Sequence, residues 1–149
     1  MPEIILPAKI DCINEAMDFL RRQIGEDNAH ISSYVELAVE ELLINVVNYA
    51  FPDASESPKE HKNILLGCRY VNMDGVKQFC VWVKDRGVPF DPFELTRTPD
   101  TSLNVEEREI GGLGVHIVKN VSNHYVYSEA DGTNTVELYF KLVDPTCEN

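Results

Sequence analysis

Hydrophobic residues recur along the chain at two different periods, which predict helices in some segments and strands in others. Steps of three and four residues between apolar positions predict helices over residues 8–24 and 34–49. Gly25 ends the first helix, and Ser32 or Ser33 can cap the second. The apolar faces of these helices are expected to pack against a common core.

Shorter apolar segments between turn residues predict five strands. The turns lie at residues 72–75 and at the Asp131-Gly132 pair. A third helix is expected from Gly111 to about Val121. This order of elements predicts an α/β (α+β) two-layer sandwich, in which a mixed, mainly antiparallel sheet carries about three helices on one face. The predicted strands cover residues 3–6, 64–71, 77–84, 124–129 and 135–142.

The segment 85–110 shows no convincing periodicity and is rich in Pro, Asp, Thr and Glu. A loop of this length inside a compact domain is uncommon, and it is usually functional or disordered. The whole chain, residues 1–149, is expected to form one domain, because its length supports one hydrophobic core and is too short for two.

Composition and charge exclude several classes of partner. A formal net charge of −12 disfavours binding to nucleic acid and to anionic membranes. The chain has no apolar run of membrane-spanning length and no signal-peptide pattern, so a cytoplasmic location is expected. Its four cysteines and four histidines are scattered, which argues against a zinc site or a redox pair. A polyphosphate ligand would therefore need backbone amides, a helix N-terminus, a few basic side chains and a metal ion.

The second predicted helix carries a polar line on an otherwise apolar segment. Glu41, Asn45 and Asn48 lie on nearly the same side of a helix, because steps of four and seven residues return to that side. Asparagine is a poor residue for a helix interior, and its carbonyl oxygen is a suitable ligand for Mg²⁺. A glutamate one turn earlier can orient or deprotonate a nucleophile near the same metal. The alternative is a solvated helix face.

A second motif follows the strand 77–84 directly and consists of Asp85-Arg-Gly-Val-Pro-Phe90. A carboxylate at the end of a strand can accept a hydrogen bond from an adenine amino group. The missing side chain at Gly87 leaves room for the flat ring. The alternative is a simple turn between strand and loop, because Asp, Gly and Pro favour turns.

The third predicted helix opens with the glycines of Gly111-Gly-Leu-Gly114. Consecutive glycines expose backbone N–H groups, and the helix adds its positive end, so together they can hold phosphates. The motif is neither a Walker loop nor a dinucleotide fingerprint, and a flexible linker is the alternative. Together these segments could bind one nucleotide. The polar helix would supply a metal ligand, the Asp85 motif would recognise the base, the long loop would cover the site, and the glycines at residue 111 would bind the phosphates.

These motifs resemble the nucleotide-binding boxes of the superfamily that includes gyrase, heat-shock chaperones, sensor histidine kinases and mismatch-repair ATPases. Glu41-Leu-Leu-Ile-Asn45 is similar to the asparagine box of that superfamily. The segments that begin at Asp85 and at Gly111 are similar to its two glycine boxes. The resemblance implies a histidine-kinase-like ATPase fold for the whole chain, with ATP and Mg²⁺ as ligands and a mobile lid over approximately residues 90–110.

Three further segments resemble the branch of serine kinases that regulate anti-anti-sigma factors. They are Ile4-Ile-Leu-Pro-Ala8, Asn48-Tyr-Ala-Phe-Pro52 and Pro89-Phe-Asp-Pro92. Membership of this branch would make the protein an RsbW-like serine/threonine kinase that phosphorylates a STAS-type anti-anti-sigma partner and also sequesters a sigma factor. The alternatives are a non-catalytic, ATP-gated protein-binding switch and a simple ATPase module. Relatives imply a homodimer.

The resemblance also assigns roles to single residues. Asn45 would bind Mg²⁺, Glu41 would act as the general base, and Asp85 would read the adenine amino group. Gly87 would flank the ring, and Thr135 resembles a threonine that supports the aspartate through water. The residues expected at the nucleotide are Asn45, Asn48, Asp85, Gly87, Pro89, Phe90, Gly111, Gly112, Leu113, Gly114 and Thr135. Arg97, Arg108 and Lys119 are the candidates to neutralise the γ-phosphate, and the sequence does not choose among them.

Overall fold

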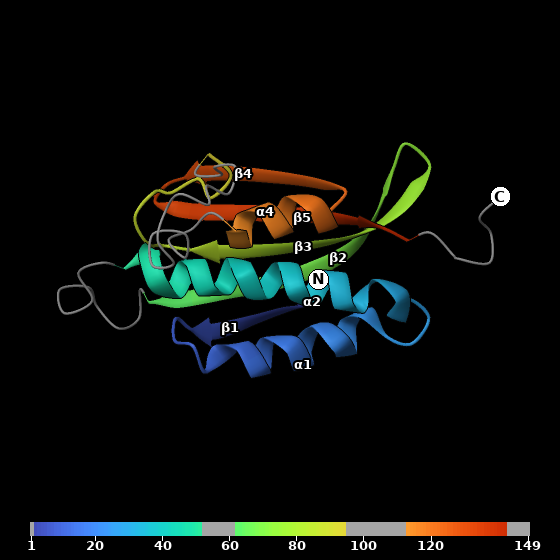
Figure 1. Cartoon of the computed structure of the whole chain (residues 1–149), viewed down its shortest axis with the longest axis horizontal. Coiled ribbons are helices and arrows are strands. Elements are labelled where there is room, and N and C mark those ends of the chain that lie inside the picture. The colour runs from blue at the N-terminus through green and yellow to red at the C-terminus, as the bar shows by residue number, and fades with distance from the viewer. Residues whose placement is uncertain (1, 52–61, 95–112, 143–149) are drawn as a thin grey trace.

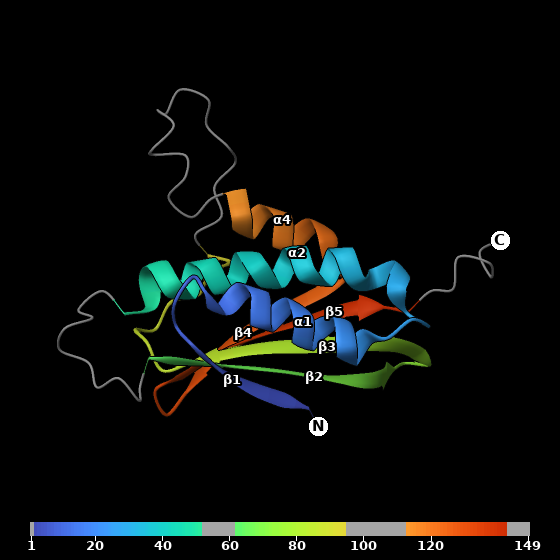
Figure 2. The ribbon, with the colours of Figure 1, turned by 90° about the horizontal axis from the view of Figure 1, so that it is seen from below.

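A single sheet and the helices on one of its faces make up the structure (Figure 1). The computed structural model describes residues 2–51, 62–94 and 113–142, which contain five strands and three α-helices. Figure 2 shows the helices together on one side of the sheet, so the predicted two-layer architecture is confirmed. In chain order the elements are β1 (Glu3–Pro7), α1 (Cys12–Ile24), α2 (Ala29–Asn45), the π-helical turn η1 (Val46–Ala50), β2 (Asn63–Met73), β3 (Val76–Asp85), α4 (Leu113–Val121), β4 (His124–Ala130) and β5 (Thr133–Lys141).

The strand order is β1-β2-β3-β5-β4, and each neighbouring pair is antiparallel. The sheet is therefore antiparallel throughout the described strands, whereas the sequence predicted a mixed, mainly antiparallel sheet. Both hairpins turn through two residues with positive φ, Asp74 and Gly75 in the first and Asp131 and Gly132 in the second. Such pairs match the right-handed twist of the flanking strands. The strand β5 lies between β3 and β4 and so brings the end of β3 beside the start of β5.

The hydrophobic core lies between the sheet and the helices. Along β5 every second residue is buried, as expected for a strand that has one face covered. The salt bridge between Arg21 of α1 and Glu36 of α2, 2.6 Å long, ties the two helices together on the outer side. The largest fully buried side chains are Phe79, Phe140, Leu6, Leu20, Leu43, Ile64, Leu66, Leu138, Val35, Val39, Val81 and Val115.

The helices begin at different residues from those predicted. α1 begins at Cys12, because Ala8 is bound through its backbone N–H to Lys62 O at 2.9 Å and the chain turns before the helix starts. α2 begins earlier than predicted, at Ala29, so the predicted serine cap is wrong. The Ser32 hydroxyl instead donates a 2.6 Å hydrogen bond to Glu36 within the helix. None of the helices in the described ranges is both long and apolar enough to cross a membrane.

Candidate functional site

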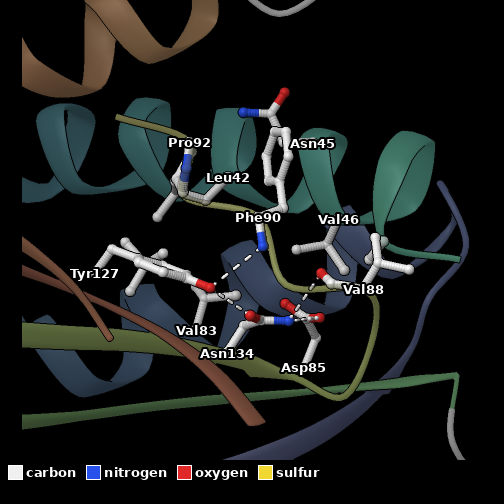
Figure 3. Close-up of a pocket in the computed structure, with 12 residues that line it drawn as sticks. Leu42, Asn45, Val46, Val83, Asp85, Val88, Phe90, Pro92, Tyr127 and Asn134 are labelled. Atoms are coloured by element: carbon white, nitrogen blue, oxygen red, sulfur yellow. Dashed lines mark hydrogen bonds between the residues drawn. The ribbon is translucent and has the colours of Figure 1, made fainter. Parts of the chain in front are cut away.

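A pocket lies between the end of α2, the end of β3 and the strands β4 and β5 (Figure 3). Its walls are mainly apolar, and each of these four elements contributes a polar side chain. A mostly apolar pocket with a few placed polar groups is typical of a small-molecule site. The lining residues are Leu42, Asn45, Val46, Ala50, Val83, Asp85, Val88, Phe90, Pro92, Tyr127, Asn134 and Val136.

Asp85 is the last residue of β3 and is only 9% exposed. Its Oδ1 accepts hydrogen bonds from the backbone N–H of Gly87 at 2.8 Å and from Asn134 Nδ2 at 3.1 Å. Its Oδ2 accepts no hydrogen bond from the residues that the structure describes. Burial raises the pKa of Asp85, and the two hydrogen bonds act against that rise. The arrangement leaves one carboxylate oxygen available to a hydrogen-bond donor on a ligand.

The residue that holds Asp85 from β5 is Asn134, which the sequence reasoning missed. Asn134 is the register partner of Asp85 and is 4% exposed. Its Oδ1 accepts a 2.6 Å hydrogen bond from the Tyr127 hydroxyl, which in turn accepts one from the Phe90 backbone N–H at 3.2 Å. A signal for this role was present, because Asn134 shares the buried face of its strand with Val136 and is polar there.

Thr135 lies on the opposite face of β5 from Asn134, because successive residues of a strand point to opposite faces. It is the register partner of Lys84 rather than of Asp85, and it does not line the pocket. The direct side-chain contact with Asp85 from β5 is made by Asn134 and not by Thr135.

Gly87 lies against the π-helical turn rather than against the open pocket. A Cβ atom added at Gly87 would collide with the backbone oxygen and the Cβ of Ala50. The next residue, Val88, donates its backbone N–H to Ala50 O at 2.9 Å. The space that was expected to admit a flat ring is thus occupied by η1, and the glycine lets the loop after β3 dock on that turn.

Replacement of Gly87 by Ala is expected to lower the free energy of unfolding by about 1–3 kcal/mol, because the new methyl group meets backbone that cannot move cheaply. Urea unfolding measures the change. Arg86→Ala, at the exposed neighbouring position, is the control and should stay within about 0.5 kcal/mol of the wild type. A Gly87→Ala protein as stable as the control would contradict the contact with Ala50.

The remaining residues of the predicted adenine motif differ in their placement. Phe90 lines the pocket, and its ring stacks on that of Tyr49 with a centroid distance of 6.0 Å. Pro89 is exposed and does not line the pocket.

The predicted polar line on the second helix is interrupted after Asn45. Asn45 is the last residue of α2 and lines the pocket. The π-helical turn that follows holds an extra residue per turn, so it rotates later side chains away from the α-helical line. Asn48 is accordingly exposed and outside the pocket lining.

Glu41 lies one helical turn before Asn45 and contacts the start of α4. A Cβ added at Gly114 would collide with Glu41 Oε2, so the carboxylate occupies the space that this glycine leaves open. Burial raises the pKa of Glu41, and the negative charge of Glu40 raises it further. The carboxylate therefore lies beside the N-terminal turn of α4, close to Asn45 in the helix.

Of the site residues predicted between residues 95 and 121, only those on α4 lie within the described part of the chain. Leu113 begins α4. Lys119 lies further along this helix, with its ammonium group 5.6 Å from the centre of the Tyr125 ring. Outside the described residues lie Gly111, Gly112, Arg97, Arg108 and most of the predicted lid, residues 95–110.

The oxygen donors of the site suit magnesium better than a transition metal. Within the described ranges no three His, Cys, Asp or Glu side chains gather into a metal site. Asn45 brings one neutral amide oxygen to the pocket from the end of α2. Mg²⁺ commonly takes one or two protein oxygens and completes its shell with water and phosphate oxygens, so this donor set fits it.

Comparison with known proteins agrees with the fold and identifies a family. A sequence profile of the histidine kinase-like ATPase domain matches residues 6–140. No curated protein matches the chain significantly. A crystal structure of the RsbU and RsbW domains of Rv1364c from Mycobacterium tuberculosis aligns with a TM-score of 0.60 at 17% identity. It covers 97% of this chain, which spans only 34% of that protein.

A second solved structure, the histidine kinase AdeS of Acinetobacter baumannii, aligns over 97% of this chain and 69% of its own with 10% identity. Its TM-score of 0.43 is too low to add to the assignment. The profile match extends from β1 to β5 and includes the helices and the pocket between them. The chain therefore belongs to the family of histidine kinase-like ATPase domains.

Proposed function

We propose that the protein binds ATP with Mg²⁺ and transfers the γ-phosphoryl group to a serine or threonine of a STAS-type anti-anti-sigma protein, with a sigma factor as a second partner. Family membership supports ATP as the ligand. The choice of a serine/threonine kinase rests on the sequence motifs that resemble the anti-sigma branch. The fold shared with the protein that contains an RsbW domain agrees with this choice at the level of architecture.

The observation that carries the proposal is the position of Glu41. Its carboxylate is half-buried against Gly114 at the start of α4, one helical turn from Asn45 in the pocket wall. The N-terminus of a helix favours phosphate groups, so the carboxylate stands where the end of a triphosphate would be bound. A module that only bound nucleotide would not need a carboxylate at this position, which by charge alone repels phosphate.

The other end of the pocket suits the base. Asp85 Oδ2 can accept a hydrogen bond from the exocyclic amino group of adenine, while Val83 and Val136 offer apolar walls to the ring. Asn45 lies between this end and Glu41, in a position to hold Mg²⁺. A bound Mg²⁺ would neutralise phosphate charge, and phosphoryl transfer depends mainly on such neutralisation and on alignment.

In the proposed reaction Glu41 accepts the proton of the partner's hydroxyl group. The hydroxyl oxygen forms a bond to the γ-phosphorus, the bond from that phosphorus to the β–γ bridging oxygen breaks, and ADP leaves. Burial and the charge of Glu40 raise the pKa of the Glu41 carboxyl, which makes its carboxylate a stronger base than that of an ordinary glutamate.

Incubation with γ-labelled ATP, Mg²⁺ and a STAS-domain protein from the same genome tests the proposal. We expect label on a serine or threonine of the STAS protein and none after that residue is changed to Ala. Release of free phosphate without labelling would show a simple ATPase. Binding of ATP with neither labelling nor phosphate release would show a switch, and either result contradicts the kinase.

Asn45→Ala is expected to remove the part of the ATP affinity that depends on Mg²⁺, because the amide oxygen is lost and no other ligand replaces it. Titration calorimetry with and without Mg²⁺ measures this difference. Asn120→Ala, at an exposed position of α4, is the control and should keep the full Mg²⁺ effect. The thermal unfolding curve of Asn45→Ala should stay cooperative. An Asn45→Ala protein that retains the Mg²⁺ effect would exclude Asn45 as the ligand.

A further inference from the structure

The side-chain amide of Asn134 is buried, with its nitrogen facing hydrogen-bond acceptors and its oxygen facing a hydrogen-bond donor (Figure 3). Its Nδ2 lies 3.1 Å from Asp85 Oδ1, 3.1 Å from Gly87 O and 3.2 Å from Val88 O. Its Oδ1 lies 2.6 Å from the Tyr127 hydroxyl. Every polar atom of the side chain is thus bound to the loop after β3 or to β4.

These contacts fix which way the amide points. Three oxygens surround Nδ2, and each of them is an acceptor when Asp85 is ionised. A flipped amide would place its own oxygen against these three, while its nitrogen would face a hydroxyl that already receives an N–H from Phe90. Asn134 is therefore a donor toward Asp85 in the folded protein.

The orientation of Asn134 determines how Asp85 meets a ligand. Two N–H groups converge on Asp85 Oδ1, one from Asn134 and one from the Gly87 backbone, and they hold the carboxylate in its acceptor form. Its Oδ2 is then the atom available to the pocket. A ligand N–H at this point would be bound, whereas a ligand carbonyl oxygen would face another oxygen and stay unpaired, which is costly in a buried site.

Tyr127 holds Asn134 from the other side and ties it to the loop. Its hydroxyl donates to Asn134 Oδ1 and accepts from the Phe90 backbone N–H at 3.2 Å. The amide therefore cannot turn without breaking the bond to Tyr127 as well as the bonds to residues 85–88. One hydrogen-bonded chain runs from Phe90 through Tyr127 and Asn134 to Asp85.

We propose that Asn134, held by Tyr127, is a positioning residue that sets the base preference of the pocket by presenting Asp85 as an acceptor. The preferred ligand is a purine nucleotide with an exocyclic amino group at position 6, and a purine with a carbonyl oxygen there is rejected. This inference rests on the proposed nucleotide-binding function and adds to it the residues that set specificity.

Affinities for ATP and for inosine triphosphate (ITP) test the proposal, because ITP carries an oxygen in place of the amino group of adenine. We expect the wild type to bind ATP at least about tenfold more tightly than ITP, as a hydrogen bond to a charged group allows. Asn134→Ala should lower the affinity for ATP and reduce the ATP-to-ITP ratio at least about threefold, since Asp85 loses a donor and can rotate. Tyr127→Phe should reduce the ratio in the same direction, because it frees the amide of Asn134.

Two substitutions serve as matched controls. Thr133→Ala changes a small residue on the opposite face of β5, and Tyr125→Phe removes a hydroxyl from β4 two residues before Tyr127. Both should keep the wild-type ratio. Circular dichroism checks that each variant is folded. If Asn134→Ala does not fold, the ATP-to-ITP affinity ratio of Tyr127→Phe alone tests the proposal.

A fall in affinity that is equal for ATP and ITP would overturn the proposal, because a merely structural role lowers both alike. An unchanged ratio in both variants would overturn it too, while leaving ATP binding itself intact. A wild-type protein that binds neither nucleotide would instead contradict the proposed function, so the two failures are distinguishable.

Discussion

Glu41→Gln is expected to lower the rate of phosphoryl transfer by about 10²–10⁴-fold, which is the contribution typical of a general base. Glutamine keeps the size of the side chain and its contact with the start of α4, but its amide oxygen cannot accept the proton of the attacking hydroxyl. ATP affinity should change little. The rate is measured in single turnovers with a STAS partner, and nucleotide affinity by calorimetry.

Glu40→Gln is the matched control, because it removes the same charge from the adjacent position of α2. Adjacent helical residues point about 100° apart, so Glu40 does not share the position of Glu41. The negative charge of Glu40 raises the pKa of Glu41, so its removal should lower that pKa. The rate of transfer rises with pH as Glu41 ionises, so this rising limb should move to lower pH in Glu40→Gln, with the plateau unchanged. Equal plateau rates for Glu41→Gln and the wild type would exclude Glu41 as the base.

Asp85→Asn is expected to weaken ATP binding by about 1.5–3 kcal/mol, roughly tenfold to 150-fold in Kd, because a hydrogen bond to a charged acceptor is lost. The fold should survive, since the Asn oxygen can still accept from the Gly87 N–H and from Asn134 Nδ2. Asp91→Asn makes the same chemical change in the same loop and keeps the bond to the Phe93 backbone N–H. Calorimetry should give wild-type affinity for this control, and a wild-type Kd in Asp85→Asn would remove Asp85 from the site.

The buried carboxyl group of Asp85 should also make the stability of the nucleotide-free protein depend on pH. Burial raises its pKa in the folded protein, so the folded state holds the proton more tightly than the unfolded state. The free energy of unfolding therefore falls as the pH rises from the unfolded pKa through the folded pKa. Asp85→Asn does not lose stability in this way, so its melting temperature relative to the wild type should increase as the pH rises from the unfolded pKa of Asp85 through its folded pKa. A difference that is constant over this range would mean that Asp85 is not desolvated.

The fold could be predicted from local pattern to a large degree. The hairpins could be predicted from the Asp-Gly pairs at residues 74–75 and 131–132, since positive φ at such pairs is a local property. The alternation of apolar and polar residues along β5 identified that strand. The helix starts were less predictable. Lys62 binds the Ala8 backbone from a distant part of the chain, and this contact delays α1 in a way that no local signal shows.

The site could be predicted in part, from residues whose chemistry is unusual for their element. Asp85 and Asn45 stand out in this way, and both line one pocket. The positions of Gly87 and Thr135 were not predictable. That of Gly87 depends on Ala50, which fills the space beside it, and that of Thr135 depends on which residues of β5 face the helices. The extra residue in η1 turns Asn48 outward and lets Ala50 dock against the loop, and helical periodicity does not reveal a π-helical turn.

We propose that the groups from α2, β3 and the start of α4 form one site for a nucleotide and a divalent cation. The decisive measurement is titration calorimetry of the wild-type protein with ATP, in the presence and absence of Mg²⁺. We expect binding of one ATP per chain, strengthened by Mg²⁺. No heat of binding with ATP and Mg²⁺ together, under conditions in which the protein is folded, would contradict it.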